Sequence, residues 1–194
     1  MKKAHVHVPD SPYIKPIIAL LLIAAGWILH SMGRLWIAAS GKIYPLILDA
    51  WSPENSQHIT DPYSTSHFLH GIVFFWLFFR LRHRLSAGAR LIMGLVIEIG
   101  WEILENSPLI IERYRSATAS LGYTGDTVLN SISDIVFCII GFYVARRIGW
   151  RASVGLFVFI EVLMALAYRD NLTLNIIMLI APSDAIRIWQ MGAQ

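Results

Sequence analysis

Apolar residues along this chain are gathered into blocks, and short polar or basic segments separate the blocks. Five of these blocks predict helices, over residues 16–39, 64–81, 89–106, 126–145 and 150–168. A helix that crosses the hydrocarbon core of a bilayer needs about 20 predominantly apolar residues, and the five blocks come close to that length. The pattern therefore predicts an all-α fold, a polytopic membrane helix bundle with five transmembrane helices.

A sixth apolar segment, residues 172–180, is too short to cross a membrane. Nine residues of helix measure only about 13 Å, and Pro182 interrupts the pattern directly afterwards. We expect this segment to be re-entrant or interfacial, and to be followed by a short helix that begins after Ser183. The alternative, in which residues 171–189 form a distorted sixth span, stays open from the sequence.

The composition supports a membrane protein and excludes several other classes. Hydrophobic residues make up 56% of the 194 residues and charged residues only 15%, which is too apolar for a soluble domain of this size. The single cysteine, Cys138, lies inside an apolar block, so we expect neither a disulfide within the chain nor a thiol metal site. The net charge of +3 comes from basic residues beside the apolar blocks, where they act as topology signals, so no nucleic-acid partner is expected.

Basic residues are divided unequally between the two sides of the predicted bundle. Ten of the sixteen lie on the side of the N-terminus: Lys2, Lys3, Lys15, Arg80, Arg82, Arg84, Arg90, Arg146, Arg147 and Arg151. Because basic loops stay in the cytoplasm, we expect a protein of the bacterial cell inner membrane with its N-terminus cytoplasmic and its C-terminus periplasmic. The chain then divides into a cytoplasmic tail (1–15), a transmembrane bundle (16–168) and a C-terminal outer-face segment (169–194).

Three glutamates lie on one face of the third predicted helix. Glu98, Glu102 and Glu105 fall within about 60° of one another, because each residue turns a helix by about 100°. Charged side chains inside a membrane segment are costly and normally face the bundle interior or a wet cavity. Polar residues of the neighbouring helices lie at a similar depth, in the outer half of the bundle: His67, His70, Asn130 and Asp134. We expect a polar pocket that opens to the outside and is closed below.

His67 and His70 are spaced three residues apart, which places both imidazoles on one helix face. Together with Glu102 they offer nitrogen and oxygen ligands for a divalent metal ion. The alternative is that the histidines only form hydrogen bonds with the glutamates. As candidate catalytic groups for acid–base chemistry we select His67, His70, Glu102 and Glu105.

The loop above the predicted pocket carries two arginines, Arg113 and Arg115. Guanidinium groups bind phosphates and carboxylates through paired N–H donors, so both are candidate anion-binding residues. The alternative is that they only neutralise the glutamates. Four further polar residues are expected to orient the catalytic groups: Glu98, Asp126, Asn130 and Asp134.

The order of the polar residues resembles an uncharacterised family of small bacterial inner-membrane proteins. The residues that carry this resemblance are Asp61, Ser64, His67, Phe68 and Gly71, then Glu102, Glu105 and Asn106, then Arg113-Tyr114-Arg115, and finally residues 125–134. The same order is more distantly similar to VanZ-like membrane proteins, from which this chain departs by its additional acids Glu98 and Asp134. The first resemblance implies no known activity, and the second implies only a role in the cell envelope, on its outer face.

These observations predict an integral membrane protein that binds or modifies an anionic lipid or a lipid-linked phosphate of the cell envelope. Whether it is an enzyme stays open. The alternative is a non-catalytic assembly or interaction protein, partnered by a second copy of itself or another envelope protein. A proton or cation pathway is less favoured, because the inner half of each predicted span is almost free of ionisable residues.

Overall fold

The computed structural model describes residues 8–120 and 122–192, and this part of the chain is helical, with no strand. Its helices are α1 (Ile14–Ser31), α2 (Ser64–Leu77), the 3₁₀-helix η1 (Phe79–His83), α3 (Ala87–Glu105), α4 (Pro108–Ala117), α5 (Val128–Tyr168), α6 (Leu172–Ile180) and α7 (Asp184–Met191). The all-helical prediction is therefore confirmed. Residues 1–7, which make up half of the predicted tail, lie outside the described residues.

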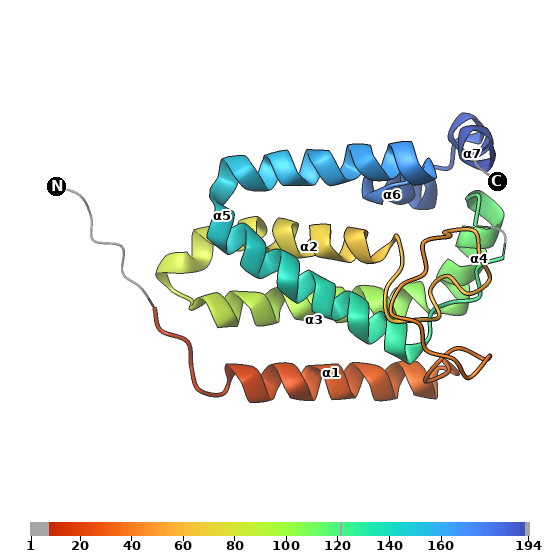
Figure 1. The fold of residues 1–194 in the computed structure, drawn as a ribbon. Helices are drawn as coiled ribbons and strands as arrows, with labels where there is room; N and C mark the ends of the chain where they lie inside the picture. Colours follow the sequence, from red (N-terminus) through yellow and green to blue (C-terminus); the bar gives the residue numbers. More distant parts are fainter. Residues whose placement is uncertain (1–7, 121, 193–194) are drawn as a thin grey trace.

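The long helices run side by side in a bundle, and α5 folds back on itself (Figure 1). The reversal occurs at Gly149, whose φ of 78° and ψ of 175° are non-helical. A positive φ of this size suits glycine, which has no Cβ to clash with the backbone. The two arms of α5 correspond to the fourth and fifth predicted helices, so the predicted break between residues 145 and 150 is confirmed.

Helix α2 packs most extensively against α5. Two glycines permit this close contact: a Cβ added to Gly71 would overlap the backbone carbonyl of Cys138, and one added to Gly141 would overlap that of Phe68. Small residues let helix backbones approach each other in this way. The buried residues around this contact, which include Leu69 and Phe142, form one hydrophobic core with α1 and α3.

Two of the helices are long and apolar enough to cross a membrane, α1 and α5. The five predicted spans are therefore not all borne out by helix length and composition. Helix α2 is shorter than predicted because a 3₁₀ segment follows it from Phe79. Helix α3 has 19 residues but contains Arg90 as well as its glutamates.

Two predicted boundaries were wrong. The first helix was expected to reach residue 39, but it ends at Ser31, and Gly33 then adopts a φ of 92° that a continuous helix cannot accommodate. The segment 107–124 was expected to be a loop, but it contains α4. Helix α4 begins where Ser107 accepts a hydrogen bond from the backbone N–H of Ile110 and Pro108 occupies the first turn.

The C-terminal part forms two short helices, α6 and α7, with a break between Ile180 and Asp184. Asn171 caps α6 by accepting a hydrogen bond from the backbone N–H of Leu174 at 2.8 Å. Both helices lie at the end of the bundle opposite the η1 connection, near the loops that follow α1 and α3 (Figure 1). The short helix expected after Ser183 is present as α7, whereas the re-entrant or interfacial placement of this segment stays a prediction.

Candidate functional site

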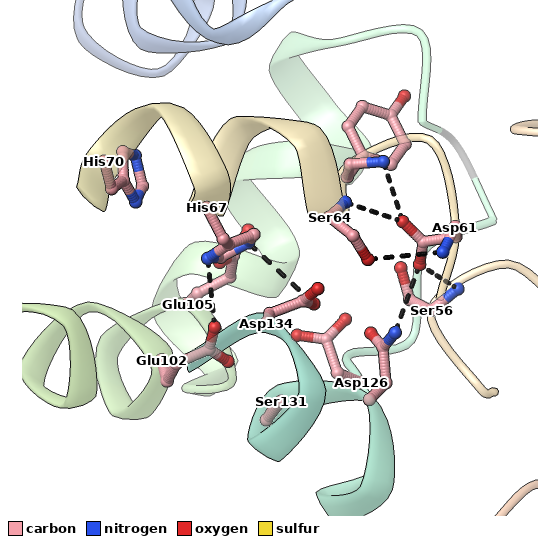
Figure 2. Close-up of polar contacts among 12 residues, drawn as sticks. Ser56, Asp61, Ser64, His67, His70, Glu102, Glu105, Asp126, Ser131 and Asp134 are labelled. Atoms are coloured by element: carbon pink, nitrogen blue, oxygen red, sulfur yellow. Dashed lines mark hydrogen bonds and ion pairs between the residues drawn. The ribbon is translucent and has the colours of Figure 1, made fainter. Parts of the chain in front are cut away.

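His67 lies at the centre of a buried polar cluster that three helices build (Figure 2). Its Nδ1 is 2.7 Å from Glu98 Oε1 and 3.2 Å from Glu102 Oε1, both on α3. Its Nε2 faces Asp134 on α5, with 3.9 Å between Nε2 and Oδ2. Residues that lie far apart in the sequence are therefore brought into one cluster, as their predicted depth and helix faces required.

Glu98 connects the two histidines of α2. Its Oε1 pairs with Nδ1 of His67 and its Oε2 with Nδ1 of His70, at 2.7 and 2.9 Å. The Glu98 side chain has no solvent exposure. A buried carboxylate is stable only when charge or hydrogen bonds compensate it, and the two imidazoles provide both. Glu98 thus contacts both imidazoles, and its orienting role in a catalytic site stays a prediction.

A second group of polar residues joins the C-terminal end of α3 to the segment before α5. The Asn106 amide donates to Asp126 Oδ2 at 2.9 Å, and Asn106 Oδ1 accepts from the backbone N–H of Asp126 at 2.7 Å. The Tyr123 hydroxyl donates to Asp126 Oδ1 at 2.9 Å. Burial raises the pKa of Asp126 to about 6, although the hydrogen bonds from Asn106 and Tyr123 act to lower it.

Asp61 fixes the first turn of α2. Its Oδ1 accepts from the backbone N–H groups of Tyr63 and Ser64, at 2.7 and 3.2 Å. Its Oδ2 accepts from the backbone N–H of Ser56 at 3.0 Å and from Asn130 Nδ2 at 3.3 Å. Asn130 therefore connects α5 to the start of α2, the helix that carries both histidines, and its orienting role stays a prediction.

A cavity of about 460 Å³ lies next to this cluster. One wall is polar and includes His67, His70, Glu98, Glu105, Asp126 and Asp134. Another part of the lining is apolar and aromatic and includes Phe74, Ile97, Trp101, Ile176 and Leu179. Ile97 and Ile176 of this lining are also solvent-exposed.

Several carboxylate oxygens in the cluster lack a hydrogen-bond partner. These buried atoms are both oxygens of Glu102, Oε2 of Glu105 and Oδ1 of Asp134. The other oxygen of Glu105 accepts a hydrogen bond from the Tyr114 hydroxyl at 2.8 Å. Leaving a buried acceptor without a partner costs about 1–3 kcal/mol, and more when the acceptor is charged. The cluster is therefore arranged to receive a proton or a cation.

The arginines expected to bind an anion lie outside the cavity lining. Arg113 Nε donates to the backbone carbonyl of Leu179 at 2.9 Å, and Arg115 Nε donates to that of Tyr123 at 2.6 Å. Both guanidinium groups therefore stabilise the loops around α4. Within the described part of the chain, no lysine or arginine lines the cavity.

Tyr114 is the main residue of the site that the sequence did not single out. Its hydroxyl donates to Glu105 and also lies 2.9 Å from Asn175 Oδ1, so it links α3, α4 and α6. The residue stands between Arg113 and Arg115, whose charges drew attention to the segment instead. A helical reading of residues 108–117 would have placed Tyr114 on the buried face of α4.

Two overlapping sets of side chains have the spacing of a metal site. One ligand atom from each of His67, His70 and Glu98 lies within 4.8 Å of the others, and the same holds for His67, Glu102 and Glu105. The predicted set of His67, His70 and Glu102 is thus divided between two groups that share His67. The geometry therefore gives two possible ligand sets, and the metal itself stays a prediction.

Comparison with known proteins identifies relatives over nearly the whole chain. Residues 29–192 match the family described as "Protein of unknown function (DUF2585)". A UPF0314 protein of Rhizobium etli is 47% identical over 163 residues, which cover 84% of each chain. A UPF0314 protein of Agrobacterium fabrum is 43% identical over 90% of this chain and 88% of its own length. A UPF0314 protein of Paracoccus denitrificans is also 43% identical, over 93% of each chain.

No solved structure matches this chain. The comparisons do not show the more distant similarity to VanZ-like proteins, whereas they support the resemblance to an uncharacterised bacterial family. With a match over most of its length and relatives above 40% identity, the chain belongs to the DUF2585/UPF0314 family.

Proposed function

We propose that this protein is a multi-pass protein of the bacterial inner membrane that binds, in the outer half of its bundle, the headgroup of an anionic lipid or a lipid-linked phosphate. The single observation that carries the proposal is the form of the cavity. Its lining combines histidines and carboxylates with apolar and aromatic side chains, of which Ile97 and Ile176 are also exposed. An amphipathic ligand that enters sideways from a bilayer fits this combination.

Exposed apolar side chains support a membrane environment. Helix α1 exposes large apolar residues along its length, among them Leu20, Ile23 and Trp27. The second arm of α5 does the same with Phe159 and Leu166. Such large exposed apolar surfaces are rare on soluble proteins and are covered by lipid in membrane proteins.

The two ends of the bundle differ in charge, which supports the proposed orientation. The end formed by η1, the start of α3 and the bend of α5 carries many of the arginines, including Arg82, Arg90 and Arg146. The histidine and carboxylate cluster lies toward the other end (Figures 1 and 2). Under the positive-inside rule the basic end is cytoplasmic, and the cavity then faces the periplasm.

Within the cavity, His67 is the best-placed group for acid–base chemistry. Glu98 holds its Nδ1, so that Nε2 faces the other carboxylates. A histidine oriented in this way by a buried carboxylate is suited to exchange a proton with a bound ligand. Glu105 stands on the same wall, with one oxygen held by Tyr114 and the other without a hydrogen bond.

Lipid binding to the purified protein tests the proposal. We expect the detergent-solubilised protein to retain phosphatidylglycerol in preference to phosphatidylethanolamine, measured by native mass spectrometry. Trp101→Ala removes part of the apolar wall and should weaken this binding about 3- to 10-fold, because an aromatic contact contributes about 0.5–1.5 kcal/mol. Trp27→Ala, on the exposed face of α1 away from the cavity, is the matched control and should change nothing.

Equal retention of both lipids, or equal weakening by Trp27→Ala, would contradict a headgroup site in this cavity. The same measurement also tests the alternative function, that of a non-catalytic assembly or interaction protein. If the polar cluster served only to hold an assembly together, no lipid would be bound selectively. Glu102→Gln would then lower thermal stability without affecting any ligand.

A further inference from the structure

Glu102 is fully buried, and neither of its carboxylate oxygens forms a hydrogen bond, although Oε1 lies 3.2 Å from Nδ1 of His67. Asp134, on the facing helix α5, is 3% exposed and has one oxygen without a partner. The neighbouring Glu105 likewise has one oxygen without a partner. Three carboxylates this close repel one another in a low-dielectric interior, so protons or a bound cation must compensate them.

The cavity offers no guanidinium or ammonium group to supply that charge, as far as the described residues show. His67 is the nearest cationic candidate, but a single imidazole cannot balance three carboxylates. A divalent cation next to a neutral His67 would reduce the sum of charges from −3 to about −1. Bound cations are often the largest local charges in such sites.

The donor atoms of three side chains have the spacing of a metal site that must close on binding. Ligand atoms of His67, Glu102 and Glu105 lie within 4.8 Å of one another, and His67 Nε2 is 3.9 Å from Asp134 Oδ2. Ligands that hold an ion at about 2.1 Å lie about 3–4 Å apart. The three side chains therefore need to move inward by at most about 1–2 Å to bind one ion.

The residues behind the ligands are also arranged for metal binding. Glu98 accepts the Nδ1 proton of His67, which leaves the Nε2 lone pair directed toward Asp134. Tyr114 holds one oxygen of Glu105 and leaves the other free. In metal sites, ligating histidines almost always donate their other N–H to a carboxylate, and ligating carboxylates are themselves hydrogen-bonded.

We propose that His67, Glu102 and Glu105 bind one divalent transition-metal ion, of the Zn²⁺ or Mn²⁺ type, with Asp134 as a further acid beside His67. One imidazole combined with carboxylates favours these ions over Mg²⁺ and Ca²⁺, which prefer oxygen ligands alone. His70 pairs with Glu98, which also holds Nδ1 of His67. His70 therefore helps to orient His67 instead of serving as a ligand. The inference rests on the proposed function in one respect: the bound ion provides the positive charge that attracts an anionic headgroup into an otherwise acidic cavity.

The test uses the full-length protein in detergent, treated with a chelator and then titrated separately with Zn²⁺, Mn²⁺ and Mg²⁺. We expect one equivalent of Zn²⁺ or Mn²⁺ by elemental analysis after desalting. The thermal midpoint should rise by about 5–10 °C when the free metal concentration is about a hundred times Kd. Mg²⁺ should give no rise.

Three variants locate the ion. Glu102→Gln should abolish the metal-induced rise, and it should leave the metal-free protein at least as stable because it removes a repelling charge. Tyr114→Phe should lower the affinity about 10- to 100-fold while retaining one equivalent at saturation, as expected for loss of a supporting hydrogen bond. Glu112→Gln, an exposed glutamate on α4, is the matched control and should behave as wild type.

Absence of a stoichiometric ion in the wild-type protein would overturn the proposal, and so would an unchanged metal response in Glu102→Gln. A Glu102→Gln variant that is much less stable without metal would also overturn it, since Glu102 would then be a structural partner of His67. Lipid retention, measured with and without metal, separates this inference from the proposed function. Metal binding without lipid binding supports the metal site and rejects the lipid function, whereas equal lipid binding with and without the chelator rejects the role of the ion in attracting the headgroup.

Discussion

At the scale of single residues, the three glutamates of α3 have different surroundings despite sharing one helix face. Glu98 is compensated by two imidazoles, and Glu105 accepts one hydrogen bond from Tyr114. Glu102 has no hydrogen bond to either oxygen, and its Oε1 lies 3.2 Å from Nδ1 of His67, which it shares with Glu98. Because its burial is the least compensated of the three, Glu102 is the position where a ligand or proton gains most.

Asp170, just after α5, gives a prediction for pH dependence. Its carboxylate accepts hydrogen bonds from Tyr63 and Gln190, at 3.2 and 2.9 Å. Burial nevertheless raises the pKa of Asp170 to about 6, from 3.8 for a free aspartate. The folded state then holds its proton more tightly than the unfolded state, so stability declines as the pH rises from about 4 to about 6.

Asp170→Asn should make this decline shallower. The difference amounts to at most about 3 kcal/mol, since each pKa unit corresponds to about 1.4 kcal/mol. Thermal midpoints measured in detergent at pH 4 and pH 6.5 provide the comparison. Asp184→Asn, which replaces an exposed acid of α7, serves as the control and should retain the wild-type slope. Identical slopes for the wild type and Asp170→Asn would show that Asp170 is not protonated in the folded protein.

Residue types and spacing predicted much of the cluster, because a shared helix face and a common depth follow from the chain alone. His67, Glu98, Glu102 and Asp134 were brought together on that basis, as the structure shows. The hydrogen bonds of Tyr114 could not be predicted in the same way. They depend on how α4 folds over the end of the bundle, which no local periodicity encodes.

At the scale of the helices, glycines control how closely α2 and α5 approach. Gly71→Ala and Gly141→Ala each place a methyl group against a backbone carbonyl of the facing helix. Backbone cannot move aside as a flexible side chain can, so each change should destabilise the protein by about 1–3 kcal/mol through overpacking. The thermal midpoint in detergent measures this loss.

Gly100→Ala and Gly155→Ala are matched controls for the same substitution within helices. A Cβ at either position meets no atom within 4 Å. These changes should be neutral or slightly stabilising, because alanine favours a helix by up to about 1 kcal/mol relative to glycine. If all four variants lost stability equally, the close packing of α2 on α5 would not be the cause.

Helix positions were more predictable than helix ends. Long apolar blocks gave α1, α2, α3 and both arms of α5, since burial or lipid contact demands apolar residues there. Helix α4 was missed because its residues 108–117 combine apolar positions with Glu112 and the two arginines, a pattern that suggested a polar loop. Its start was nevertheless encoded, in the Ser107-Pro108 pair that caps the first turn.

At the scale of the whole molecule, the orientation of the bundle decides which compartment the cavity serves. The basic end and the polar cluster lie toward opposite ends, so an arrangement that keeps the arginines in the cytoplasm also exposes the cavity to the periplasm. Among the helices of the described residues, only α1 and α5 are long and apolar enough to cross a membrane. Five spans therefore require α2 with η1 and α3 to cross inside a bundle whose other helices shield their polar residues.

Labelling of single cysteines in whole cells tests this topology. In a Cys138→Ser background we expect a membrane-impermeant maleimide to label Glu112→Cys, on α4 near the cavity, and not Arg84→Cys, next to η1. Both positions are exposed on the protein, so a difference in labelling reports the membrane and not burial. After cell lysis both should react, which provides the internal control. Labelling of Arg84→Cys alone would invert the orientation and place the cavity in the cytoplasm. Equal labelling of both in intact cells would mean that the bundle does not separate the two ends across a bilayer, and the argument for a periplasmic lipid ligand would lose its basis.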